Sequence, residues 1–261
     1  MYNIFKLDNG LRIVAEQIDY VNSVSVGLWV QNGSRNEDIK NNGISHFIEH
    51  MLFKGTKKRN AKEIAESIEN VGGQINAFTG KEVTCFYIKV LHTHLDLSLD
   101  ILSDMLFNST FSEEGIEKEK GVVIEEILMN EDSPEDVLSD LHSKAIWGDD
   151  SITFPILGTE DNVKSFNKEI LVNYLLSHYI PQNSVISVVG KFDIKKIEKK
   201  IEKYFGIWKS GKGDVTRYTS PEICNDVLFK KKKIEQLNMS LGIPGFGISN
   251  ENIYTLLLLN N

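Results

Sequence analysis

The chain has 261 residues, of which 41% are apolar and 25% are charged, a composition typical of a soluble globular protein. Its formal net charge of −8 argues against a nucleic-acid partner or an anionic membrane surface, because both would favour a basic protein. No apolar run approaches the ~20 residues of a membrane span, so we expect no membrane partner. The two cysteines, Cys85 and Cys224, form no Cys-x-x-Cys motif and are expected to be free thiols. Together with the lack of an apparent secretory signal, they indicate a cytoplasmic protein.

The N-terminal third of the chain predicts two β-hairpins. Asp8-Asn9-Gly10 lies between β-prone runs at 2–7 and 11–17, and Asn-Gly in that setting is a strong hairpin signal. The elements expected next are a strand at 24–30, a polar loop at 31–38, a helix that contains residues 46–50, a helix at 61–71 that Gly72-Gly73 ends, and a hairpin with strands at 74–79 and 82–91. Either Ser45 or the Asn41-Asn42 pair is expected to cap the helix that contains residues 46–50.

Helical patterns dominate the middle of the chain. Leu95, Leu99, Leu102 and Leu106 recur at helical spacing. The elements that follow are a helix capped by Ser112 that ends near residue 130, a helix that starts at Ser133-Pro134, a helix near 163–178, a strand at 185–189, and a helix capped by Asp193. These elements predict an α+β fold in which helices pack on a mainly antiparallel sheet.

The composition changes after residue 208, where glycine, lysine and serine predict a flexible linker over 209–224. Two strands, at 227–231 and 237–243, and the start of a helix at 250–259 are expected beyond it. The ~35 residues after the linker are too few to bury a core of their own. We therefore expect a complete domain over 1–208 and, over 225–261, the truncated start of a second domain.

The segment His46-Phe47-Ile48-Glu49-His50 is the clearest chemical signal in the sequence. On a helix, His46 and His50 lie one turn apart on the same face as Glu49. Two such imidazoles can bind one metal ion, and the carboxylate can reach a water on that ion. The order H-x-x-E-H is an inverted zinc-peptidase signature, although a pentapeptide with three fixed residues also occurs by chance on ordinary helix surfaces.

A catalytic zinc ion usually has a third protein ligand, and the helix expected after Ser112 offers candidates for it. Glu126 falls on the apolar side of that helix, whereas Glu125 projects toward the Gly121 side. A carboxylate on a core-facing surface is costly unless a metal or a lysine neutralises it. Glu126 is therefore the predicted third ligand. Glu119, seven residues earlier and nearly in register, is expected to form a hydrogen bond to a ligand histidine.

The other four histidines, His92, His94, His142 and His178, are expected to have ordinary structural roles at the core edge or on the surface.

The sequence resembles the pitrilysin/insulinase family of inverted-motif zinc peptidases, in particular its bacterial members similar to the mitochondrial processing peptidase. The matching stretches follow one another in family order, at residues 46–56, 73–79, 119–127, 155–159, 179–184 and 189–190. The resemblance implies a metallohydrolase domain of the mitochondrial processing peptidase type. It also implies that His46, His50 and Glu126 bind Zn²⁺, that Glu49 is the catalytic base, and that Glu119 supports catalysis.

The same resemblance implies how a peptide substrate binds. Asn76, Ala77 and Phe78 match the edge strand against which the family adds an extended substrate, a mode in which main-chain hydrogen bonds hold many sequences. Family members also have a second homologous domain or subunit that encloses the site. We expect this chain to contain only the start of such a half, so the resemblance does not imply a full active chamber for this polypeptide alone.

The sequence therefore predicts a zinc endopeptidase in which water attacks the peptide carbonyl and Glu49 transfers the proton. Two alternatives belong to other classes. One is a non-catalytic peptide-binding or scaffold subunit of the same family, although such members typically have a degraded metal motif. The other is a zinc hydrolase that acts on something other than peptides, against which the strand at residues 74–79 is weak evidence.

Overall fold

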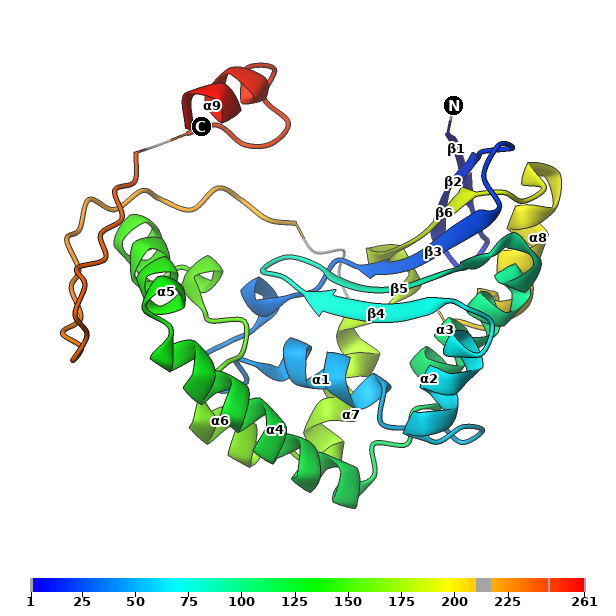
Figure 1. Ribbon diagram of the computed structural model, residues 1–261, viewed down its shortest axis with the longest axis horizontal. Helices are drawn as coiled ribbons and strands as arrows, with labels where there is room; N and C mark the ends of the chain where they lie inside the picture. The colour runs from blue at the N-terminus through cyan, green and yellow to red at the C-terminus, as the bar shows by residue number, and fades with distance from the viewer. Residues whose placement is uncertain (1, 210–216, 244, 261) are drawn as a thin grey trace.

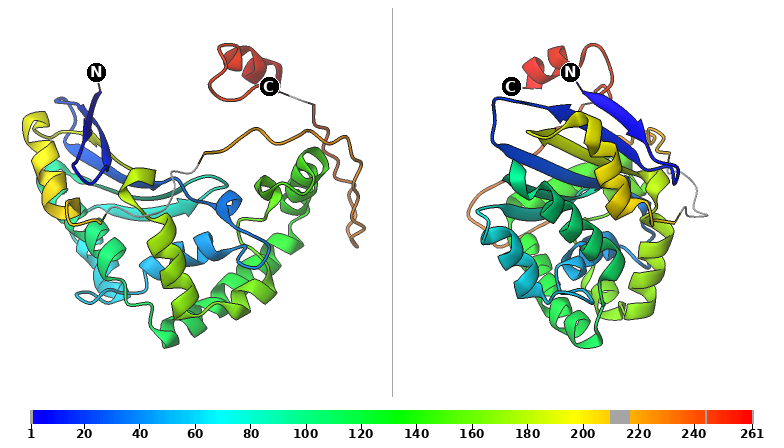
Figure 2. Two further views of the ribbon diagram at one scale, coloured as in Figure 1. Left: turned by 180° about the vertical axis from the view of Figure 1, so that it is seen from behind. Right: turned by 90° about the vertical axis from the view of Figure 1, so that its right-hand side faces the viewer.

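The computed structural model describes residues 2–209, 217–243 and 245–260. One six-stranded sheet forms the upper layer of the molecule in Figure 1, and helices cover one of its faces. The two further views in Figure 2 show the same layering from behind and from the side. The predicted fold class, helices packed on a mainly antiparallel sheet, is confirmed.

The strands are β1 Asn3–Lys6, β2 Arg12–Gln17, β3 Ser23–Val30, β4 Gln74–Thr79, β5 Thr84–Leu91 and β6 Ser184–Gly190. Their order across the sheet is β1-β2-β6-β3-β5-β4, in which β2 and β6 run parallel and all other neighbours run antiparallel. The N-terminal hairpin and the β4–β5 hairpin therefore lie at opposite ends of the sheet. As a consequence β4 is an edge strand with one side of its backbone unpaired by the sheet.

The helices are α1 Ile44–Leu52, α2 Ala61–Glu69, α3 Leu95–Asn108, α4 Glu113–Asp132, α5 Pro134–Trp147, α6 Glu160–Ser165, α7 Lys168–His178, α8 Ile194–Phe205 and α9 Ile253–Asn260. In Figure 1, α1 lies directly beneath β4, and α4 runs along the other side of α1. No helix in the described part of the chain has both the length and the apolar character needed to cross a bilayer.

The core lies between the covered face of the sheet and the helices beneath it. Its fully buried side chains include Val26, Leu28, Ile88, Leu99, Leu102, Ile186, Val188, Ile197 and Ile201. Helix α1 contributes Phe47 and Ile48, both with no exposed surface, to this core. Side chains three or four positions apart lie on the same face of a helix. His46, Glu49 and His50 therefore share a face, and burial of Phe47 and Ile48 in the core leaves that face on the less buried side of α1.

One predicted helix is divided in two. The expected helix near 163–178 is interrupted at Phe166-Asn167, between α6 and α7. Phe166 is 1% exposed and packs edge-to-face on Phe47 of α1, at 5.4 Å between ring centroids. The side chain of Asn167 then accepts a hydrogen bond from the amide of Ile170 and caps α7. Burial of the aromatic ring and a new cap together explain the break.

The two strands predicted at 227–231 and 237–243 are wrong, because residues 217–243 contain neither a strand nor a helix. Val227, Phe229, Leu237 and Met239 are each more than 80% exposed. A strand needs a neighbouring strand for its backbone hydrogen bonds, and none of the described residues in 217–243 belongs to the six-stranded sheet. Residues 210–216 of the predicted linker lie outside the described residues. The three-part domain division therefore stays a prediction.

Helix α1 begins without the predicted cap. Its first flanking residue is Gly43, whose φ of +99° lies in the left-handed region that favours glycine. A buried carboxylate from outside the helix takes the place of a cap: Glu37 accepts hydrogen bonds from the amides of Gly43 and Ser45, each at 2.8 Å. The side-chain amide of Asn42 donates a further hydrogen bond to Glu37 at 2.8 Å, and it also donates one to the Pro155 carbonyl at 2.8 Å. The start of α1 is thereby fixed to two separate loops.

Ser45, one of the predicted caps, has a different role. Its hydroxyl accepts a hydrogen bond from Asn32 at 3.0 Å and lies 3.2 Å from the Tyr174 hydroxyl of α7. The prediction was wrong because Glu37, eight residues earlier, reaches the same amides across the loop.

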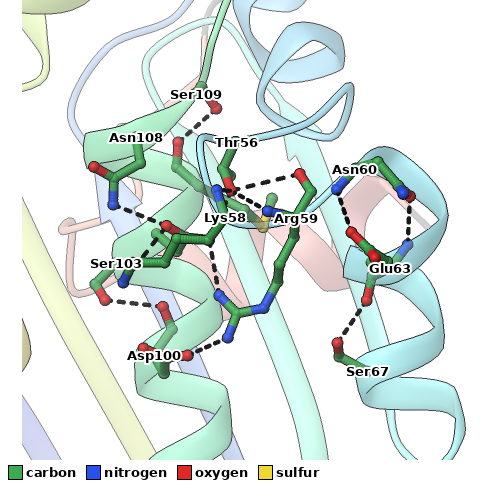
Figure 3. A network of polar contacts seen from close by, with 12 residues as sticks. Thr56, Lys58, Arg59, Asn60, Glu63, Ser67, Asp100, Ser103, Asn108 and Ser109 are labelled. Atoms are coloured by element: carbon green, nitrogen blue, oxygen red, sulfur yellow. Dashed lines mark hydrogen bonds and ion pairs between the residues drawn. The ribbon is translucent and has the colours of Figure 1, made fainter.

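The end of α1 leads into a loop that is fastened to α3 (Figure 3). The buried carboxylate of Asp104 accepts hydrogen bonds at 2.8 Å from Thr56 and from Arg59. The Thr56 hydroxyl in turn accepts from the amides of Lys58 and Arg59 at 3.0 Å. Arg59 also forms an ion pair with Asp100. Helix α1 is consequently held at both of its ends.

We predict that Glu37→Ala destabilises the chain by about 2–6 kcal/mol, because it leaves two buried backbone amides without an acceptor and each costs about 1–3 kcal/mol. Urea unfolding followed by circular dichroism measures the change. The matched control is Asn60→Ala, which removes the side-chain cap of α2 and should cost only about 1 kcal/mol. Equal losses for the two variants would contradict the special role assigned to Glu37.

Candidate metal centre

Helix α1 presents two imidazoles to α4. The ring centroids of His46 and His50 lie 4.5 Å apart, as expected for side chains one helical turn apart. Their side chains are 12% and 18% exposed, so both rings are largely removed from water without being sealed off. A partly accessible pair of this kind can accept a ligand from outside.

Glu126 of α4 completes a cluster of three. Its Oε2 lies 3.7 Å from His46 Nε2 and 3.6 Å from His50 Nε2. One ligand atom from each of the three residues lies within 4.8 Å of the others. In a tetrahedral zinc site with bonds of 2.0–2.2 Å, neighbouring ligand atoms are about 3.3 Å apart, so a small inward movement would suffice. The neighbouring Glu125 is exposed and lies outside the cluster.

This cluster is the only group of three or more His, Cys, Asp or Glu residues with metal-site spacing among the described residues. The other histidines lie elsewhere. His142 of α5 contacts the Ser240 hydroxyl, and His178 of α7 stacks on Tyr174 at 3.9 Å between ring centroids. His92 and His94 belong to a short 3₁₀ turn before α3.

Glu119 of α4 lies behind His50. Its Oε1 is 2.7 Å from His50 Nδ1, and its Oε2 is 2.7 Å from the ammonium group of Lys54. Burial would raise the pKa of Glu119, but these hydrogen bonds and the two positive partners lower it below its ordinary value. An ionised carboxylate can only accept, so Nδ1 of His50 carries a hydrogen, and in the neutral form of the ring the lone pair is on Nε2, the atom nearer to Glu126.

The two histidines differ in their protonation. Burial, and then the neighbouring His50, lowers the pKa of His46 to about 4. Burial opposes the charged form of His50 too, but Glu119, Glu126 and Glu49 raise its pKa overall. The Nδ1 atom of His46 is buried and has no hydrogen-bond partner among the described residues. His46 is therefore a neutral imidazole at ordinary pH, the form that binds metals.

Glu49 lies on α1 between the two histidines but does not join the cluster of three. The hydroxyl of Thr79, the last residue of β4, donates a hydrogen bond of 2.6 Å to Glu49 Oε2. Burial raises the pKa of the Glu49 carboxyl, and the nearby charge of Glu126 adds to the effect. A carboxyl with a raised pKa is suited to accept a proton and release it again.

The predicted substrate strand, Asn76, Ala77 and Phe78, lies on β4 at the edge of the sheet. The amide of Ala77 donates to its neighbour's side-chain oxygen, Asn76 Oδ1, at 2.8 Å rather than to β5. It therefore points to the open edge. Phe78 is 43% exposed and packs edge-to-face on Trp29, at 5.8 Å between ring centroids.

Three residues around the centre were missed by the sequence analysis: Glu37, Lys54 and Thr79. Strand alternation could have found Thr79, because residues 75, 77 and 79 share the face toward the helices. No local pattern signals Glu37 or Lys54, since each acts on a group that the fold brings to it.

Two family profiles match the chain. The profile described as "Insulinase (Peptidase family M16)" matches residues 12–160, and the profile described as "Peptidase M16 inactive domain" matches residues 165–261. Among curated proteins, an uncharacterised zinc protease of Bacillus subtilis is 48% identical over all of this chain and 63% of its own length. One of Streptomyces coelicolor is 37% identical over 97% of this chain and 57% of its own length. The chain thus spans less than two thirds of these relatives.

Solved structures share the fold. A protease from Helicobacter pylori superposes with a TM-score of 0.77 and 25% sequence identity, over 85% of this chain and 54% of that one. Pitrilysin superposes with a TM-score of 0.76 and 21% identity, over 85% of this chain and 24% of that one.

In the metal-free chain, we predict that the two histidines titrate far apart. His50 should take up a proton above the ordinary histidine pKa of about 6.5, whereas His46 should remain neutral down to about pH 4. Two-dimensional NMR of ¹⁵N-labelled imidazole rings, recorded as a pH series, measures both midpoints. A His46 midpoint near 6.5 would show that its ring is not buried as described.

Proposed function

The chain belongs to the insulinase family of peptidases, peptidase family M16, and we propose that it is the metal-binding part of a zinc endopeptidase. The substrates of this enzyme would be peptides in extended form. The observation that carries the proposal is the approach of Glu126 to within 3.7 Å of both imidazole Nε2 atoms, with Glu49 held beside them. The residues come from two helices that are far apart in the sequence. Such a convergence of ligand atoms from two helices is not expected of polar residues that merely lie on the surface.

His46, His50 and Glu126 would hold the ion. Two neutral nitrogen donors and one carboxylate are a common ligand set of catalytic zinc, which leaves a fourth position for water or substrate. The relatives from Bacillus and Streptomyces are named zinc proteases, which supports zinc as the metal. When bound, zinc would lower the pKa of a water molecule toward ~7 and polarise the scissile carbonyl.

Glu49 would act as the general base and then as the general acid. It accepts a proton as the water oxygen bonds to the peptide carbonyl carbon, and it returns that proton to the amine as the carbon–nitrogen bond breaks. The Thr79 hydroxyl holds one oxygen of Glu49, so the other remains available for the proton. Glu119 would keep His50 in the tautomer that coordinates through Nε2.

The substrate would bind along β4. Because Asn76–Phe78 lie on an edge strand, a peptide in extended form could pair with the unpaired side of the backbone. The last residue of the same strand, Thr79, contacts the proposed base. Pairing with β4 would therefore place a peptide bond next to Glu49 in a register that depends little on the peptide's side chains.

A second homologous domain or subunit would enclose the site. The relatives are longer than this chain, and the second family profile covers residues 165–261. We propose that the complete chamber needs that additional part, and that this chain supplies the metal ligands and the base. We further propose that the protein acts in the cytoplasm.

Glu49→Gln should retain one zinc ion per chain and lose peptide cleavage by about 10²–10⁴-fold, because the amide cannot accept the proton. Zinc is measured by elemental analysis, and cleavage by a fluorescence-quenched unstructured peptide, with the chain supplied together with its second half. Small amides and esters, tested in parallel, distinguish a peptidase from another hydrolase. A wild-type protein that binds zinc and peptide but cleaves nothing would instead favour a scaffold subunit.

Mutation of a residue that only hydrogen-bonds to a metal ligand typically weakens metal binding by about 10–100-fold. Glu126→Gln should weaken zinc binding by more than this, because it removes a ligand itself. Competition with a chromophoric chelator measures the dissociation constant. The matched control is Glu125→Gln, which makes the same chemical change one position away on the exposed face of α4. Equal affinities for the two variants would remove Glu126 from the ligand set.

A further inference from the structure

We propose that Lys54 is a positioning residue for the metal centre, because it fixes the carboxylate that orients His50. The proposal rests on the zinc site proposed above. It concerns a residue four positions beyond His50 that lies outside the H-x-x-E-H motif and is not expected to contact the ion.

The observation is a chain of three side chains. The Lys54 ammonium lies 2.7 Å from Glu119 Oε2, and the other oxygen of the same carboxylate lies 2.7 Å from His50 Nδ1. The Glu119 side chain is 4% exposed, whereas Lys54 is 38% exposed. Water thus has little access to the carboxylate, and these two partners account for its two oxygens.

The backbone around Lys54 is fixed without help from a metal. The Lys54 amide donates to the Met51 carbonyl at 3.1 Å, which closes the last turn of α1. The next residue, Gly55, has a φ of +124° and its carbonyl accepts from the Thr110 amide at 3.1 Å. Beyond it, the hydrogen bond from Thr56 to Asp104 ties the loop to α3. Lys54 is consequently presented to Glu119 by a rigid support.

A carboxylate that is held at both oxygens cannot rotate. If Lys54 is removed, Glu119 Oε2 loses its partner in a buried position, which is costly. The carboxylate can then turn to recover a hydrogen bond, and Oε1 leaves the line of His50 Nδ1. The His50 ring loses its fixed orientation, and with it the aim of Nε2 toward Glu126.

The charges around the site point the same way. Glu49, Glu119 and Glu126 bring three carboxylates together, and among the described residues Lys54 is the only lysine or arginine with an ion pair to any of them. A divalent ion and one ammonium group balance three carboxylates. His46 has no comparable support, since no described residue bonds to its Nδ1 atom, and its orientation depends on burial.

The test compares zinc affinity in the wild-type chain, Lys54→Met and Lys54→Arg. Lys58→Met is the matched control, because Lys58 lies on the same loop and faces a different buried carboxylate, Asp104, at 3.9 Å. Chelator competition gives each dissociation constant, and the thermal midpoint of the metal-free protein reports the fold. If Lys54→Met does not fold, Lys54→Gln replaces it.

We expect Lys54→Met or Lys54→Gln to bind zinc about 10–100-fold more weakly, Lys54→Arg to remain closer to wild type, and Lys58→Met to be unchanged. Wild-type affinity in a folded Lys54→Met or Lys54→Gln would overturn the proposal, as would an equal loss in Lys58→Met. An arginine variant as weak as the methionine variant would also overturn it. A wild-type chain with no zinc affinity would instead refute the proposed function itself.

Discussion

The candidate metal centre depends on the packing of helix α1 against helix α4. Helix α1 is inserted between the edge strand β4 and helix α4, and its buried side chains Phe47 and Ile48 fix its rotation. That rotation decides which residues face α4. Since Glu126 arrives from a different helix, the convergence of ligand atoms depends on tertiary packing and not on the H-x-x-E-H segment alone.

Two buried carboxylates, Glu37 and Asp104, hold α1 in this position. Glu37 binds the amides at the start of the helix, and Asp104 holds the loop after its end. Burying a carboxylate is costly unless its hydrogen bonds are satisfied, and both are satisfied several times over. The two carboxylates thus serve the geometry of the site although neither belongs to it. Glu119 is the third of this kind, and it is the one that touches a proposed ligand.

Much of the fold could be predicted from local patterns, because hairpin turns, helix caps and apolar periodicity act over a few residues. Ser112, Ser133 and Asp193 cap their helices as predicted. The start of α1 could not be predicted, since its cap comes from Glu37 through a loop closed by tertiary contacts. The apolar residues at 227–243 predicted strands that these residues do not form, because a strand also requires a neighbouring strand. The spacing of His46, Glu49 and His50 was readable from the sequence, whereas Glu37 and Lys54 act on groups that only the folded chain brings to them.

The site described above should bind one zinc ion through three side chains, His46 and His50 of α1 and Glu126 of α4. X-ray diffraction from crystals grown with zinc, measured on both sides of the zinc absorption edge, tests it most directly. One anomalous peak is expected, at bonding distance from His46 Nε2, His50 Nε2 and a carboxylate oxygen of Glu126. A peak bound elsewhere, or one bound to the histidines with Glu126 turned to solvent, would contradict it.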